Sequence, residues 1–171
     1  PNWAFNMPKS ESQSSSSAKL SIAGLKISDG EITYFDARKG TTKALRQANV
    51  SLSLASMDAP AAFALDAVYD GNKFSVSGSA DSPNTYLAKT PTKVALDLKS
   101  DLINLHFDGS VTGMTDDSGS FTASGPSLRE LIKKGAGTTA PTGGLGAFTA
   151  SGSVAAKDQV YALQGAKISL D

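Results

Sequence analysis

The sequence predicts an all-β fold, a long twisted antiparallel meander of about ten strands. Apolar and small polar residues alternate through most of the chain, which is the period of a strand with one buried face. A Phe-x-x-Ser-Gly stem recurs at residues 74–78, 121–125 and 148–152, with a looser copy at 107–113. Turn residues separate these segments at short intervals, which favours hairpin connections between neighbouring strands.

Composition excludes several classes of protein. The chain has 171 residues, no net charge and scattered Lys and Arg, whereas nucleic-acid binding needs a clustered basic excess. It has no cysteine, which excludes disulfides, thiolate metal sites and cysteine catalysis. No apolar run approaches the roughly 20 residues of a membrane-spanning helix. The chain begins at Pro1 without an initiator Met, and we expect it to be an internal module of a longer protein.

The first half of the chain predicts a leader followed by strands. Residues 1–18 are expected to form a flexible Ser-rich leader or linker, and residues 19–171 a single β domain. Asp29-Gly30 predicts a hairpin turn between strands at 20–27 and 31–36, because Gly accepts a positive φ. The next strands are expected at 43–56, 60–69 and 73–81, the last two joined by an Asp-Gly turn. Ser82-Pro83 then predicts a helical turn over 82–89.

The second half predicts strands around one short helix. Strands are expected at 92–100 and 102–113, then a turn at 116–119 and a strand at 120–125. Ser127 and Glu130 have the spacing of a capping box, which predicts a helix over 126–134. After a Gly-rich loop, strands at 145–156 and 159–170 are expected to form the last hairpin.

Residues that could carry catalysis or bind a metal are scarce. His106 is the single histidine, and its phase opposite to Leu105 and Phe107 predicts a solvent-facing side chain. No Ser lies in a Gly-x-Ser-x-Gly nucleophile elbow. Asp116-Asp117 lacks the further oxygen ligands of a calcium loop. The sequence therefore predicts no catalytic residue, no metal ligand and no cofactor.

The apolar side of the alternation is the candidate binding surface. If one helix is all that covers this side, the sheet either closes on itself as a sandwich or stays open as a half-barrel or trough. An open trough suits acyl chains, and the same side chains would form plain core in a sandwich. The candidate groove residues are Val50, Leu52, Leu54, Phe63, Leu65, Phe74, Val76, Val94, Leu96, Leu98, Ile103, Leu105 and Phe107.

The order of these segments resembles the AsmA family of bacterial envelope proteins. Residues 25–36 carry a Leu-x-Ile-x-x-Gly-Glu-Ile-x-Tyr-x-Asp cadence, and 45–54 are similar to the alternating strand that follows it in that family. The stem at 121–125, the Ser-Leu helix after it, the Gly-rich loop and the stem at 148–152 resemble a later block. The resemblance covers most of residues 19–171.

This resemblance implies a lipid-handling role without catalysis. AsmA-family proteins are anchored in the inner membrane, extend through the periplasm, and are implicated in outer-membrane assembly and phospholipid transport along a β-sheet groove. It implies a periplasmic module tethered by flanking segments, with a phospholipid or another acyl ligand and other modules of the same chain as partners. The alternative is a structural envelope module that binds proteins by sheet-edge pairing. An enzyme is the least favoured reading.

Overall fold

The computed structural model describes residues 22–37, 40–69, 71–112, 116–136, 138–157 and 160–171. The expected leader at 1–18 lies outside these residues. The strands are β1 (Ile22–Asp36), β2 (Thr41–Leu54), β3 (Ala61–Tyr69), β4 (Asn72–Ala80), β5 (Thr92–Ser100), β6 (Asn104–Val111), β7 (Asp116–Gly125), β8 (Phe148–Lys157) and β9 (Val160–Leu170). The helical segments are α1 (Pro83–Leu87), α2 (Leu128–Leu131) and the π-helical turn η1 (Ile132–Ala136).

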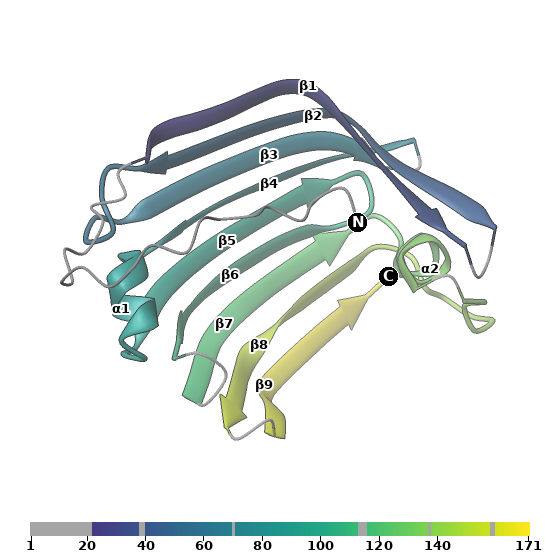
Figure 1. Cartoon of the computed structure of the whole chain (residues 1–171). Coiled ribbons are helices and arrows are strands. Elements are labelled where there is room, and N and C mark those ends of the chain that lie inside the picture. The colour runs from purple at the N-terminus through teal and green to yellow at the C-terminus, as the bar shows by residue number, and fades with distance from the viewer. Residues whose placement is uncertain (1–21, 38–39, 70, 113–115, 137, 158–159) are drawn as a thin grey trace, which may run out of the picture.

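All nine described strands belong to one open antiparallel sheet, which confirms the predicted fold class. Their order in the sheet is their order in the chain, β1 to β9, so every neighbouring pair is a simple up-and-down connection. Figure 1 shows the strands side by side in an arch, with α1 at one end of the strands and α2 at the other. The described strands form a single layer, so the sandwich alternative is not adopted.

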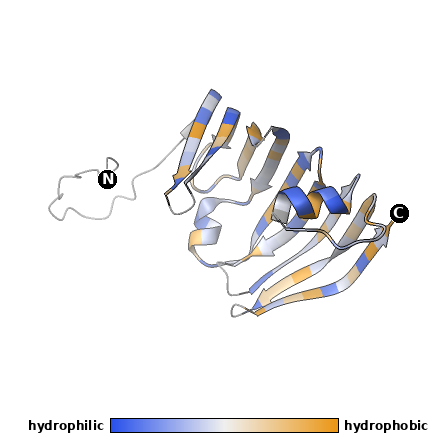
Figure 2. Cartoon of the chain, turned by 90° about the vertical axis from the view of Figure 1, so that its right-hand side faces the viewer, coloured by the Kyte–Doolittle hydropathy of each residue, from blue (hydrophilic) through white to orange (hydrophobic). Residues whose placement is uncertain are grey.

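The register defines two chemically different faces of the sheet. Residues directly opposite each other in an antiparallel pair share a face, so partners can be followed from strand to strand. One row that crosses the whole sheet is Ile27, Val50, Leu65, Val76, Leu98, Leu105, Ala123, Ala150 and Ile168. We call the side that carries this row the apolar face and the opposite side the polar face. Hydrophobic and hydrophilic residues accordingly alternate along the strands (Figure 2).

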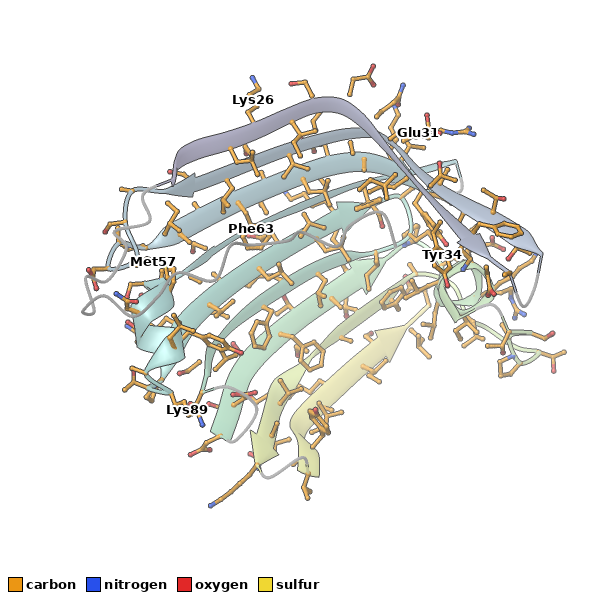
Figure 3. The ribbon with its side chains drawn as sticks, in the orientation of Figure 1. Lys26, Glu31, Tyr34, Met57, Phe63 and Lys89 are labelled. Carbon is orange, nitrogen blue, oxygen red and sulfur yellow. The ribbon has the colours of Figure 1, made fainter. Side chains whose placement is uncertain are left out.

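The two faces also differ in their position on the arch. Figure 3 shows Phe63 on the inner side of the arch and Lys26 on its outer side. Phe63 stands in register with Leu52 and Gly78 on the apolar face. Lys26 stands opposite Ser51 on the polar face. The apolar face therefore lines the inside of the arch.

The hairpin predicted at Asp29-Gly30 is wrong, because β1 runs through these residues without reversing. Asp29 has a φ of 52° and lies in a β-bulge, where one strand has an extra residue. Gln47 on β2 also has a φ of 52° and forms a second bulge almost opposite. A positive φ is compatible with a bulge as well as with a turn. Here it forms a bulge, because the 14-residue strand β2 pairs with β1 on both sides of Asp29.

The side chain of Asn49 joins these two bulges. Its Oδ1 accepts a hydrogen bond from the Asp29 amide at 3.1 Å, and its Nδ2 donates to the Gln47 carbonyl at 3.1 Å. One extra residue in each strand keeps Ile32 and Leu45 in register on the apolar face beyond the bulges. Figure 1 shows that β1 and β2 bend sharply along their length. Bulges of this kind bend and twist a strand pair, and they explain the bend.

The turn predicted at 116–119 is also wrong, because β7 already begins at Asp116. The Asp117 carboxylate accepts a hydrogen bond from the Thr112 amide at 2.6 Å, and the Thr112 hydroxyl donates to the Asp116 carbonyl at 2.9 Å. These bonds hold the start of β7 against the end of β6. Gly119 stands opposite Gly109 as a regular strand pair. The residues predicted to form the turn therefore belong to β7.

The helical predictions are confirmed in place but not in length. The Ser82 hydroxyl accepts a hydrogen bond from the Thr85 amide at 3.2 Å and caps α1 as expected. The Ser127 hydroxyl likewise accepts from the Glu130 amide at 3.2 Å and caps α2. The α-helix there ends after four residues and continues as the π-helical turn η1. The helical stretch therefore spans 128–136 instead of the predicted 126–134, and only its first four residues are α-helical.

We expect the Asn49→Ala variant to lose about 1 kcal/mol of unfolding free energy, because two bulge backbone groups lose their hydrogen-bond partner. Urea denaturation followed by far-UV circular dichroism measures this loss. Asn104→Ala is the control, because Asn104 lies on the same polar face and its side chain makes no hydrogen bond to the described residues. Equal midpoints for both variants would show that Asn49 does not hold the bulges.

Candidate functional site: an open apolar sheet face

The structure places twelve of the thirteen predicted groove residues on the apolar face. Val50, Leu65, Val76, Leu98 and Leu105 occupy the row described above. The neighbouring row contains Leu52, Phe63, Leu96 and Phe107, and the row beyond it contains Leu54 and Val94. Phe74 stands opposite Ala67 and Ser100, one row away on the other side. Ile103 lies just before β6 in the β5–β6 connection, where its carbonyl accepts a hydrogen bond from the Ser100 amide at 3.0 Å.

This apolar surface is only half buried. Leu54, at 7% exposure, is the only buried residue among the thirteen candidates, and the other twelve are intermediate. No side chain of the described residues is less than 2% exposed. The helical segments α1, α2 and η1 lie in the connections at the ends of the strands, so none of them crosses the apolar face (Figure 1). The described part of the chain therefore presents an apolar surface without a covering layer.

Sequence reasoning missed the part of the face that the outer strands contribute. The missed residues include Leu25, Ile27, Phe121, Ala123, Phe148, Ala150, Val154, Leu163, Ile168 and Leu170. Residues on β1 and β9 were missed because bulges interrupt their alternation. The repeated Phe-x-x-Ser-Gly stem was the available signal for those on β7 and β8.

The repeated stem has a structural explanation in ring-on-glycine pairs. Phe148 stands opposite Gly125, and Phe121 stands opposite Gly152, so the stems of β7 and β8 pair with each other reciprocally. A Cβ built on Gly125 would lie 2.5 Å from a ring carbon of Phe148, and one built on Gly152 would lie 3.2 Å from Phe121. The rings therefore occupy the space that a side chain would need.

The same arrangement recurs across the middle of the sheet. A Cβ on Gly78 would lie 2.7 Å from the ring of Phe63. The ring of Phe107 covers two glycines, 2.6 Å from a Cβ on Gly109 and 2.5 Å from one on Gly119. Aromatic rings of this kind compensate for the packing that glycines in strands lack. They cover the glycine backbone with a continuous apolar surface.

The polar face carries short side chains and is hollowed. One hollow of about 560 Å³ crosses β5 to β9, and its lining includes His106, Lys99 and Lys167. A second of about 460 Å³ crosses β2 to β6. Many of the side chains on this face are Ser, Thr or Ala, which leave space between the longer ones. These hollows lie on the opposite side of the sheet from the predicted groove.

His106 is solvent-facing, as predicted. Its Nδ1 lies 2.8 Å from Oδ1 of Asp97, and the two side chains are 51% and 47% exposed. Thr122 is its cross-strand neighbour, with Ser151 one strand beyond. Neither hydroxyl is hydrogen-bonded to the imidazole in the described part of the chain. The two side chains therefore form an exposed contact of a kind that contributes little to stability.

The described residues were also searched for metal-binding clusters and for membrane-spanning helices. They contain no cluster of three or more His, Cys, Asp or Glu side chains that could hold a metal ion. Among them there is also no helix with the length and apolar character needed to cross a membrane.

Comparison with known proteins identifies no relative. No family model, curated protein or solved structure matches the chain. Its function is therefore inferred from the chemistry of the sheet and from the resemblance in segment order.

We expect Gly78→Ala to lower the unfolding free energy by about 1–3 kcal/mol, because the new methyl would overpack the strand pair. It would lie 2.6 Å from the Ala95 carbonyl oxygen and 2.7 Å from the Phe63 ring. Gly24→Ala is the matched control, since its methyl would meet only the Leu52 carbonyl oxygen at 3.7 Å. Thermal unfolding of both variants measures the difference. A Gly78→Ala protein as stable as wild type would contradict the ring-on-glycine packing.

Proposed function

We propose that the chain is a non-enzymatic lipid-handling module whose apolar face holds acyl chains inside the arch of the sheet. The observation that carries this proposal is the half-buried apolar face, which crosses all nine strands without a covering layer in the described residues. Contiguous exposed apolar surface of this extent is costly in water and marks an interaction site.

The dimensions and chemistry of the face suit an acyl ligand. Strands lie about 4.8 Å apart, so nine strands span about 38 Å from β1 to β9. The surface consists of aliphatic side chains and phenyl rings that lie over glycines, with no charged residue in the central row. Each methylene that an acyl chain buries there contributes about 0.8 kcal/mol. A chain of ten methylenes would thus gain about 8 kcal/mol before the cost of ordering it.

The resemblance to AsmA-family proteins supports the same proposal and adds its cellular setting. On this reading the module lies in the periplasm, is tethered to the inner membrane by flanking segments, and contributes to outer-membrane assembly or phospholipid transport. Its ligand is a phospholipid or another acyl compound, and it adjoins other modules of the same chain. The exposed His106–Asp97 pair gives little support to an enzyme, because no nucleophile is hydrogen-bonded to it in the described residues.

The edge strands support a second candidate function, pairing of the sheet with a neighbouring protein. Every described residue of β9 is exposed, and the large apolar ones include Tyr161 at 79% and Ile168 at 69%. On β1, Tyr34 is 63% exposed. Each of these strands has a described neighbour on one side only. Unpaired edges with exposed apolar residues act as templates for pairing with another strand.

We expect phospholipid to co-purify with the wild-type protein and to be detected by native mass spectrometry. The Ala123→Trp variant should bind it about tenfold more weakly, because the indole would displace about two methylenes worth ~0.8 kcal/mol each. Ala123 lies in the central row, opposite Leu105 and Ala150.

The control for this experiment is Thr122→Trp, which places the same side chain on the polar face of the same strand. It should bind phospholipid as wild type does. Wild-type protein that neither retains phospholipid nor binds it when offered would refute the lipid proposal. Equal losses in the two variants would place lipid elsewhere on the molecule.

The second candidate predicts self-association through the β9 edge. The Asp171 amide donates to the Ala147 carbonyl at 3.0 Å, so alternate amides back along β9, including that of Ile168, point away from β8. Ile168→Pro removes one outward donor and should weaken self-association about tenfold. Ile168→Thr keeps the amide and should associate more strongly than the proline variant. Sedimentation velocity measures both, and a wild-type protein that stays monomeric would exclude pairing between copies.

A further inference from the structure

The larger hollow of the polar face is a trough with a floor and two walls. Its volume is about 560 Å³, and its lining takes three consecutive residues from each of the strands β5 to β9. These strands lie side by side in the sheet (Figure 1). The middle residue of each triplet belongs to the central row of the apolar face, so only its backbone faces the trough. The residues of this floor are Leu98, Leu105, Ala123, Ala150 and Ile168.

Two rows of polar side chains in register form the walls, so the trough runs across the strands. One wall consists of Asp97, His106, Thr122, Ser151 and Lys167. The other wall consists of Lys99, Asn104, Ser124, Thr149 and Ser169. Because neighbouring strands lie about 4.8 Å apart, the trough is about 19 Å long, and its walls are about 7 Å apart, the advance of two residues along a strand. Each strand therefore contributes one polar side chain to each wall.

Most polar groups of these walls have no partner among the described residues. The exception is the contact of 2.8 Å between His106 and Asp97, and Asp97 is the single carboxylate among the described lining residues. The ammonium groups of Lys99 and Lys167 form no ion pair or hydrogen bond with a described residue, and neither do the wall hydroxyls. The trough therefore presents a cation near each end and hydroxyl groups between them.

We infer that this trough binds a linear acidic glycan, with one sugar ring over each strand. A ring of an extended β-1,4-linked glycan advances by close to one strand spacing, whereas a residue of an extended polypeptide advances by only about 3.3 Å. Sugar hydroxyls donate and accept hydrogen bonds, as do the hydroxyl and amide groups of the walls. Sheet faces bind oligosaccharides in this way in other β folds.

The charge of the trough favours an acidic glycan over a neutral one. Carboxylates on the sugar rings would lie near Lys99 at one end and Lys167 at the other, and ammonium groups form charge-assisted hydrogen bonds with carboxylates. The trough lies on the opposite side of the sheet from the proposed acyl surface. The inference therefore does not rest on the lipid-handling function.

The test titrates the isotope-labelled whole protein at low salt and follows its backbone amide signals by NMR. The probes are the β-1,4-linked mannuronate hexamer, the neutral β-1,4-linked mannohexaose and poly-L-glutamate. The Lys99→Gln/Lys167→Gln variant should bind the mannuronate hexamer about tenfold more weakly than wild type and bind mannohexaose unchanged, because only charge is lost. The control is Lys26→Gln/Lys93→Gln, which removes two charges from the polar face outside the trough and should bind as wild type does.

Two further variants test the trough without a change of charge. Thr122→Val/Thr149→Val keeps the shape of both side chains but removes their hydroxyls, and it should bind both sugars about tenfold more weakly. Its control is Thr33→Val/Thr42→Val, which makes the same change on β1 and β2. Thr122→Trp would fill the trough and should abolish sugar binding, whereas Ala123→Trp on the opposite face should leave it unchanged.

The outcomes separate a glycan site from general attraction between charges. Hexamer binding that shifts the amide signals of the lining residues and is weakened by the trough variants alone supports the inference. Wild-type protein that does not bind the mannuronate hexamer overturns it. Equal losses in the two lysine variants, or poly-L-glutamate bound as tightly as the hexamer, also overturn it, because charge alone would explain the binding. Sugar binding in a protein that never binds phospholipid supports the trough and refutes only the lipid proposal.

Discussion

The structure depends on an unbroken register that holds apolar side chains in rows across nine strands. A slip of one residue between two strands would move every side chain of one of them to the other face. Because the described sheet is a single layer, it has no second layer whose packing would correct such a slip. Cross-strand contacts and ladder hydrogen bonds must therefore fix it. The ring-on-glycine pairs serve this purpose, since Phe121 opposite Gly152 and Phe148 opposite Gly125 fit only in the observed register.

The open apolar face poses a physical problem that both proposed functions answer. Half-buried aliphatic rows gain only part of the free energy that a closed core would give. A ligand that covers the face, or a neighbouring sheet that continues it at β9, would complete the burial. The polar face does not have this problem, because short Ser, Thr and Ala side chains and charged or amide groups make up most of it. The two faces therefore differ in kind, and only the inner one leaves rows of aliphatic side chains half-buried in the described residues.

Prediction from sequence succeeded where alternation was regular and failed where a bulge interrupted it. The strand at Thr92–Ser100 was predicted with its observed bounds, because its period is unbroken between two turn signals. The first strand was divided at Asp29-Gly30, since a positive φ is equally typical of a hairpin turn and of a bulge. Twelve of the thirteen groove candidates lie on the apolar face, but the contributions of β1 and β9 to this face were not predicted.

By itself the sequence determined the antiparallel meander, the composition of each face and the position of both capped helices. These follow from local causes, namely the period of two, turn residues and serine caps. Only the tertiary structure decided that the sheet is open rather than folded into a sandwich, because both use the same alternation. It also decided that the repeated stems of β7 and β8 pair reciprocally. These are contacts between segments distant in the chain, which local patterns do not specify.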